Sequence, residues 1–370
     1  MNTKKQFRLF LTILSVILIT TLSVCAFSFR NMTLDFVHIS DTHISANRAD
    51  TSYKALSSSA FLLKDMVNQI NKIKGLDFVM FSGDLVDSAS YENYELYYTT
   101  LSKLKYPSLN AFGNHDFYGD MTKEQVLETV KEHNKNYIFD DTYYAITPKT
   151  DYRIIVLDST IKNQNTSNGR LSPEQLKFLD NELMENQDKV VVIVMHHPSV
   201  EPFVSVDHSL LNANEFNEIL LKYKNPIVVL SGHYHASKIR KIGNLVFVST
   251  PALVTYPMAA RHIKIVNFKD RVQYKFDFMN TTLTDIKEQN RQSVISYSAL
   301  AGLERDRTTE FTFFKRRAKS ANYKRNKIKN AAKTTKTSKK ELKKLLGDQE
   351  VKKEKKQRRF FFRKKRNQEI

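Results

Sequence analysis

The hydrophobic residues between positions 34 and 278 fall into nine short runs bounded by turn-forming residues. Most runs are continuous and rich in β-branched residues, which is typical of strands buried on both faces of a sheet. We therefore predict strands at nine places. The runs are residues 34–40, 76–82, 108–112, 153–158, 190–195, 226–231, 244–249, 262–268 and 272–278.

Segments with helical periodicity lie between the earlier strands. The clearest begins at Ser172, where Pro173 suits the first helical position and Gln175 completes a capping box. Strands and helices alternate first, and the last three strands follow one another directly. This order predicts a layered α/β domain with a mixed sheet or a pair of sheets. Further helices are predicted over residues 55–73, 91–104, 123–133 and 213–223, with a weaker pattern over 281–307.

The N-terminal end differs from this body in composition. Three basic residues precede an uncharged apolar run, residues 9–29, which is about as long as a bilayer-spanning helix. We therefore expect residues 1–30 to form a transmembrane anchor. Its N-terminal end would lie in the cytoplasm, because basic residues that flank a span stay there. The protein would then be a single-pass protein of the cell membrane with its remainder outside. A signal peptide cleaved near residues 24–26, giving a secreted protein, is the alternative.

The net charge of +19 lies entirely in the C-terminal part of the 370-residue chain. Residues 315–370 contain 24 Lys or Arg and 5 Asp or Glu, whereas residues 1–314 contain 34 of each. The chain is thus predicted to have an anchor (1–30), a folded body (31–310) and a polybasic tail (311–370). The tail has few aliphatic residues and is expected to be disordered or loosely helical. Its cations suit anionic lipid or cell-wall polymer, and no specific nucleic acid is expected.

Polar residues that can bind a metal or move a proton follow five of the predicted strands. Ligand sites in α/β sheets form where strand ends converge, so these side chains are expected to meet. Carboxylate, imidazole and amide oxygen together suit Mn, Fe or Zn, and the single cysteine excludes a thiolate cluster. A metal centre is therefore predicted. The residues are Asp41, His43, Asp84, Asn114, His115, His196, His233 and His235.

These stretches, read as D-x-H, GD, GNHD, H and GHxH, resemble the calcineurin-like metallophosphoesterases, and within them the class III cyclic nucleotide phosphodiesterases. The resemblance implies a four-layer αββα sandwich of mixed β-sheets with a dinuclear metal centre. His115 would contact the phosphoryl group and protonate the leaving oxygen. The resemblance implies that one metal is held by Asp41, His43, Asp84 and His235, and the other by Asp84, Asn114, His196 and His233.

The predicted function is metal-dependent hydrolysis of a small phosphoester, a phosphodiester rather than a phosphomonoester. Two divalent or mixed-valence transition metal ions can share a water, lower its pKa and aim the resulting hydroxide at phosphorus. With the predicted anchor, the enzyme would face outward from the cytoplasmic membrane. The alternative is a non-enzymatic surface scaffold whose tail binds anionic polymer or lipid, and the complete ligand set argues against it.

Overall fold

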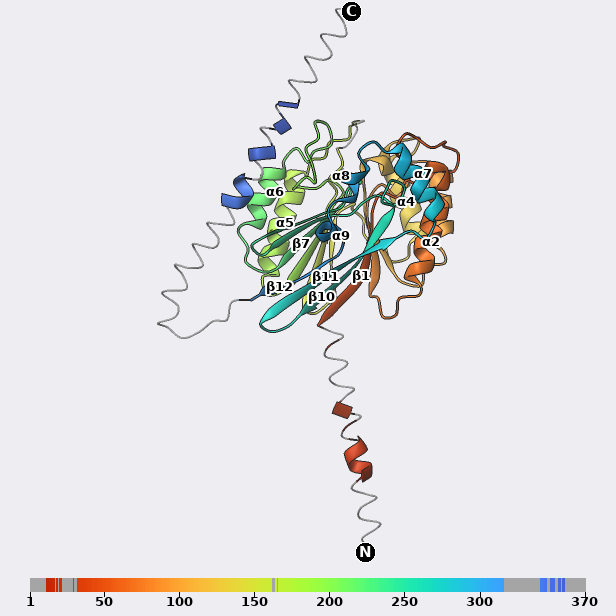
Figure 1. Cartoon of the computed structure of the whole chain (residues 1–370). Coiled ribbons are helices and arrows are strands. Elements are labelled where there is room, and N and C mark those ends of the chain that lie inside the picture. The colour runs from red at the N-terminus through yellow and green to blue at the C-terminus, as the bar shows by residue number, and fades with distance from the viewer. Residues whose placement is uncertain are drawn as a thin grey trace, which may run out of the picture.

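Two six-stranded mixed sheets form the centre of the molecule (Figure 1). The computed structural model describes residues 11–16, 18, 20–21, 29, 32–161, 164, 166–315, 340–344, 347–349, 352–353 and 355–356. The first sheet has the strand order β12-β11-β10-β1-β2-β3, and the second has the order β4-β5-β6-β7-β9-β8.

The first sheet is parallel on one side and antiparallel on the other. Strands β1, β2 and β3 run parallel, while β10 pairs antiparallel with β1, and β11 and β12 continue that antiparallel half. Its strands are β1 (Thr33–Ile39), β2 (Phe78–Ser82), β3 (Ser108–Ala111), β10 (Ala259–Asn267), β11 (Arg271–Asn280) and β12 (Thr309–Phe314).

The second sheet has a parallel centre with an antiparallel strand at each edge. Strands β5, β6, β7 and β9 are parallel, and β4 and β8 pair antiparallel with β5 and β9. The strands are β4 (Tyr144–Lys149), β5 (Tyr152–Val156), β6 (Val190–Val194), β7 (Ile227–Ser231), β8 (Lys238–Ile242) and β9 (Leu245–Ser249).

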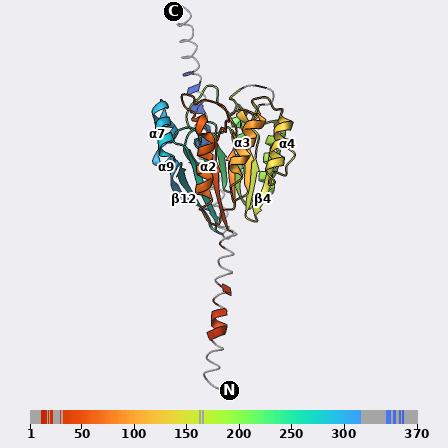
Figure 2. The ribbon, with the colours of Figure 1, turned by 90° about the vertical axis from the view of Figure 1, so that its right-hand side faces the viewer.

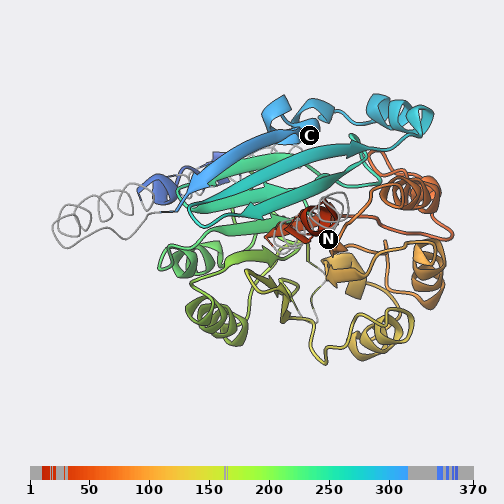
Figure 3. The same ribbon diagram turned by 90° about the horizontal axis from the view of Figure 1, so that it is seen from below.

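Helices cover the outer faces of the paired sheets. Helices α2 and α3 pack on the first sheet and α5 and α6 on the second, and Figures 2 and 3 show the helices arranged around the two central sheets. This arrangement confirms the predicted α/β class with two mixed sheets. The helices are α2 (Ser59–Ile70), α3 (Tyr91–Leu101), α4 (Lys123–His133), α5 (Pro173–Glu185), α6 (Ala213–Leu220), α7 (Thr284–Ser293), α8 (Tyr297–Ala301) and α9 (Glu304–Arg307), with 3-10 turns η1 (Leu56–Ser58) and η2 (Asn114–Phe117).

Strand β6 shows why the central strands are continuously apolar. Val190, Val192 and Val194 belong to the core shared with the first sheet. The intervening Val191 and Ile193 pack in the separate core under α5 and α6. Since successive side chains of a strand point to opposite faces, a strand between two cores needs an apolar residue at every position.

Helix α5 begins where the sequence predicts, but Gln175 has a different partner. The Ser172 hydroxyl accepts a hydrogen bond from the Gln175 backbone N–H at 3.3 Å, as an N-cap should. The Gln175 side chain does not complete a capping box. It bonds both the N–H and the carbonyl of Asp158, each at 2.8 Å, and so ties the helix start to the loop that follows β5.

The predicted membrane anchor is corrected by the structure. Among the described residues, no helix has both the length and the apolar character needed to cross a bilayer. The prediction of a single-pass membrane protein is therefore wrong for the described residues, and the other residues of 1–30 lie outside them.

Residues 311–314 of the predicted tail belong to strand β12, whereas the described residues between 340 and 356 are helical and lie against the body beside α6. Leu342 is fully buried in the core of α5 and α6. Lys353 forms an ion pair with the buried carboxylate of Glu201. The tail was predicted to be disordered or loosely helical, and these residues are helical and docked. The remaining residues of 316–370 lie outside the described part of the chain.

Replacing Leu342 tests this docking. Leu342→Asp places a carboxylate in an apolar core, and burying an unpaired charge is strongly unfavourable. We expect residues 340–356 to leave the body and to be cut by trypsin faster, by roughly tenfold or more for a lost docking energy of about 1.4 kcal/mol. Glu341→Gln is the control, because the Glu341 side chain is exposed and the change leaves every trypsin site in place. Equal cleavage of the wild type and Leu342→Asp would contradict the docked arrangement.

Candidate metal centre

The predicted ligands share an unusual backbone conformation at the strand ends. Among the described residues, six non-glycine residues have positive φ, and five of them are predicted ligands. Non-glycine residues rarely adopt a positive φ, because it strains the backbone. Such strain persists where the surrounding structure imposes it, often at functional sites. The loops thus hold these side chains in a fixed arrangement. The five are Asp41 (φ 52°), His43 (39°), Asp84 (51°), His233 (68°) and His235 (53°).

Two glycines allow these loops to approach each other. A Cβ at Gly232 would lie 1.7 Å from the Ser40 hydroxyl oxygen, and a Cβ at Gly113 would lie 2.2 Å from Asp84 Oδ1. Neither position can hold a side chain without displacing the ligand loops. The GNHD and GHxH stretches therefore need glycine at these two positions for close packing around the centre.

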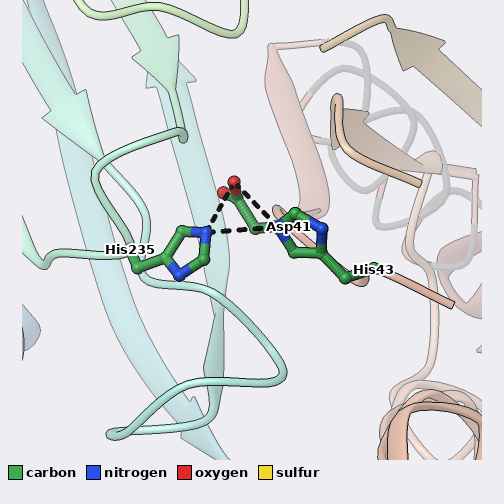
Figure 4. Close-up of side chains that lie close together, drawn as sticks. All are labelled: Asp41, His43 and His235. Carbon is green, nitrogen blue, oxygen red and sulfur yellow. Dashed lines mark hydrogen bonds and ion pairs between the residues drawn. The ribbon is translucent and has the colours of Figure 1, made fainter. Parts of the chain in front are cut away.

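Asp41, His43 and His235 form the first cluster, from the ends of β1 and β7. Figure 4 shows the Asp41 carboxylate beside both imidazoles. The Nε2 atoms of His43 and His235 are 3.2 Å apart, and Asp41 Oδ1 is 3.3 Å from His235 Nε2 and 3.9 Å from His43 Nε2. All three side chains are buried, and their ligand atoms are close enough to bind one cation together.

Asp84, His196 and His233 form the second cluster. His196 Nε2 is 3.2 Å from Asp84 Oδ2 and 3.0 Å from His233 Nδ1. The same Asp84 oxygen is 3.5 Å from His43 Nε2, in the first cluster. Asp84 therefore lies between the two clusters. Asn114 Oδ1 is buried at the adjoining cavity and accepts no hydrogen bond from any described residue, as suits an oxygen ligand.

Neighbouring groups orient the imidazoles of three histidines. The Nδ1 atoms of His196, His235 and His43 lie 2.8 Å from the Ser82 carbonyl, 3.0 Å from the Thr255 hydroxyl and 3.2 Å from the Asp87 carboxylate. We assign the proton of each ring to Nδ1, which leaves the Nε2 lone pair facing the centre. This is the usual outer arrangement of histidine ligands.

The electrostatics of the centre favour cations. Burial raises the pKa of Asp84, but the neighbouring imidazoles of His196, His115 and His43 together outweigh burial, and the net pKa lies well below the usual value. Burial lowers the pKa of His196, yet Asp84 raises it to about 9. Burial, with a smaller contribution from Lys54, lowers the pKa of His43 to about 3. The carboxylates are thus ionised and draw positive charge, which a metal ion would supply in place of the proton on His196.

The GNHD stretch forms η2 and carries His115 to the edge of the centre. The His115 N–H donates to Asp84 Oδ1 at 2.9 Å, and His115 Nδ1 lies 2.7 Å from the Asp87 carbonyl. Asp116 accepts from the N–H groups of Gly113 and Leu85, at 2.8 and 2.7 Å. Asp116 therefore stabilises the turn, whereas His115 directs its Nε2 away from these contacts.

The comparisons with known proteins identify the family. The profile of the family described as Calcineurin-like phosphoesterase matches residues 34–237, which is more than half of the chain and includes every predicted ligand. The chain belongs to this family. It is a metallophosphoesterase, a hydrolase that acts on phosphoester bonds.

Similar proteins agree with the assignment. The chain is 28% identical over 228 residues to the probable glycerophosphodiester phosphodiesterase GpdQ of Arcobacter nitrofigilis, covering 60% of this chain and 79% of the relative. It is 24% identical to the 3′,5′-cyclic AMP phosphodiesterase CpdA of Haemophilus influenzae, covering 59% and 76%. A dimetal phosphatase from Danio rerio has a similar fold, with a TM-score of 0.53 and 16% identity over 67% of this chain and 99% of that one.

The structure also brings residues to this metallophosphoesterase site that sequence reasoning missed. Asp87 contacts His43, Arg48 and Lys54 through its carboxylate, at 3.2, 2.8 and 3.1 Å. Its position three residues after Asp84, in the same loop, is the signal that could have found it. Lys54 lies in a loop without a motif, and nothing in the sequence marked it. His208 follows none of the predicted strands, and it lines the cavity beside His233.

Asp84 is the ligand whose loss should matter most. Asp84→Ala removes the carboxylate that lies between both clusters, so we expect the metal content to fall and turnover to drop by roughly 10²–10³-fold or more. Metal is measured by mass spectrometry on protein of confirmed fold. Asp120→Ala, an exposed aspartate beyond the GNHD turn, is the control. Near-normal turnover with metal bound in Asp84→Ala would contradict the shared-ligand assignment.

Proposed function

We propose that this metallophosphoesterase hydrolyses a small phosphodiester at a dinuclear metal centre. The observation that carries the proposal is the position of Asp84 Oδ2, within 3.5 Å of His43 Nε2 and 3.2 Å of His196 Nε2. One carboxylate thus serves two ligand clusters. The ions suited to this donor set are Mn, Fe or Zn, because the donors are carboxylate, imidazole and amide oxygen.

The residues divide into two ligand sets and one group that acts on the substrate. Bound cations would lower the pKa of a water and neutralise charge on the phosphoryl oxygens. Asp41, His43 and His235 hold one ion, and Asn114, His196 and His233 hold the other. Asp84 contributes to both sets. The loops with positive φ keep the ligands in place, so that little rearrangement is needed when an ion binds.

His115 is assigned to the leaving group. Its Nδ1 is fixed by the Asp87 carbonyl, and its N–H is fixed by Asp84, so the ring has one orientation. Its Nε2 lies 3.5 Å from the Lys54 ammonium, at a cavity of about 520 Å³ that also reaches Asp84, Asn114 and His233. When the ring is protonated, the Nε2–H group can donate to a phosphoryl oxygen or give its proton to the departing alkoxide.

A diester fits better than a monoester because the cavity has room and apolar walls for a second substituent. Tyr53, Phe203 and Ile295 line the cavity beside the ligands. The similar proteins GpdQ and CpdA, named as phosphodiesterases, support this choice. The family match does not include the tail, and the comparisons support neither a membrane nor an anionic polymer as its partner.

The activity is tested on the purified full chain with added Mn. Bis-p-nitrophenyl phosphate, p-nitrophenyl phosphate, 3′,5′-cyclic AMP and a glycerophosphodiester are compared by kcat/KM. We expect the diesters to be preferred. A protein that binds metal but hydrolyses none of them would refute the proposed function, and preference for the monoester would refute its diester part.

The role of His115 predicts a dependence on the leaving group. His115→Ala should retain metal and lose roughly 10²–10⁴-fold in rate on substrates with poor leaving groups, as for a lost general acid. Activated aryl esters should lose less, because their leaving groups need no proton. His133→Ala, at the end of α4, is the control histidine. Equal losses on both substrate types would leave His115 with a positioning role only.

A further inference from the structure

Lys54 is a buried cation next to the metal centre that the ligand sets do not use. It is 5% exposed and lines the cavity together with His115, Asn114 and Asp84. Its ammonium nitrogen is 3.1 Å from Asp87 Oδ1 and 3.5 Å from His115 Nε2. The positive charge therefore lies beside the histidine atom that faces the substrate.

The backbone around Lys54 is fixed. The Lys54 N–H donates to the Thr51 hydroxyl at 2.9 Å, and the Lys54 carbonyl accepts from the Thr51 N–H at 2.9 Å. The next residue, Ala55, donates to the Val254 carbonyl at 2.8 Å. The lysine thus extends from a closed turn that is bonded to the loop after β9, and its reach into the cavity is set by the fold.

Asp87 does not need Lys54 to balance its charge. Its second oxygen, Oδ2, forms an ion pair with Arg48 at 2.8 Å, and His43 Nδ1 lies 3.2 Å from Oδ1. Taking an ammonium out of water is costly unless it gains strong partners. A lysine kept there beside an already paired carboxylate points to a second use for the charge.

The hydrogen-bond count of the ammonium leaves a donor available. A lysine has three N–H groups; the Asp87 carboxylate accepts one, and His115 Nε2 can accept a second only while it carries no proton. His43 Nδ1 is 3.2 Å away, but it carries the proton directed to Asp87 and cannot accept. One N–H therefore has no acceptor among the described residues and is available to a ligand in the cavity.

We propose that Lys54 contacts the substrate directly and donates a hydrogen bond to an oxygen of the phosphoryl group beside His115. This inference rests on the proposed function, since it concerns the same site. Its ammonium adds a positive charge to the cavity beside His115. The contact would also strengthen binding of the phosphate product, so that inorganic phosphate is a suitable probe.

The test measures phosphate affinity by calorimetry on the full chain loaded with Mn. Lys54→Met keeps the chain length and removes the charge, and we expect the Kd for phosphate to rise roughly 10- to 100-fold, the range for a lost hydrogen bond to a charged group. Metal content should not change. Lys54→Arg, which keeps a donor, should recover part of the affinity, and kcat/KM for diesters should follow the same order.

Arg48→Met is the matched control. Arg48 pairs with the same carboxylate, but its side chain is 58% exposed and is not among the cavity residues. Its loss should change the Kd by less than about threefold, as for a surface ion pair. If Arg48→Met and Lys54→Met raise the Kd for phosphate equally, Lys54 acts through Asp87 and not by contacting the substrate, and the proposal is overturned.

The remaining outcomes also decide the question. Unchanged phosphate affinity in folded, metal-loaded Lys54→Met would overturn the contact. A further outcome is that Lys54→Met loses its metal while Lys54→Arg binds phosphate as the wild type does. That result would assign Lys54 a structural role and would also overturn the proposed contact with the substrate. Lys54-dependent phosphate binding in a protein without phosphoester turnover would refute the proposed function alone. Turnover with Lys54-independent phosphate binding would refute only this inference.

Discussion

The buried carboxylate of Asp84 sets the conditions for the rest of the site. It is 1% exposed, and among the described residues its ion-pairing partners are imidazoles, with no lysine or arginine. A buried carboxylate without a matching positive charge is costly, so the site is arranged to gather cations. The backbone N–H of His115 satisfies one oxygen, and the other lies between the two ligand clusters. The position of the metal centre, the η2 turn and the direction of His115 all follow from this one group.

The two-sheet architecture makes that arrangement possible. Strands β1, β2 and β3 end beside β6 and β7 of the other sheet, and a ligand follows each of these five strands. These five strands are buried at every position, and close packing on both faces holds their ends in place. The cost appears in the loops, where five ligands take strained backbone conformations and Gly113 and Gly232 permit contacts that no side chain would allow.

The sequence predicts strands well where successive residues are all buried, and poorly where buried and exposed residues mix along a strand. All nine predicted strands are present, because continuous apolar runs mark strands covered on both faces. The strands β4, β8 and β12 were missed, and each lies at the edge of a sheet where half-exposed positions break the pattern. The ligand set was found because each ligand follows such a run. Lys54 could not be found, because its contacts with Asp87 and His115 come from tertiary packing of a loop.

Part of the cavity wall lies beyond the residues that match the family, so the family match indicates the reaction more closely than it indicates the substrate. The match ends at residue 237, but Val294, Ile295 and Leu300 of the cavity wall lie beyond it. The Leu300 carbonyl of this wall accepts a hydrogen bond from the Ser237 N–H at 2.7 Å, and Arg261 donates to the nearby carbonyls of Asp306 and Arg307 at 2.6 and 2.8 Å. Burial lowers the pKa of Arg261 to about 9, and the guanidinium tolerates that burial because these carbonyls accept its N–H groups. The proposed ligands therefore lie inside the region that matches the family, whereas this part of the cavity wall lies outside it.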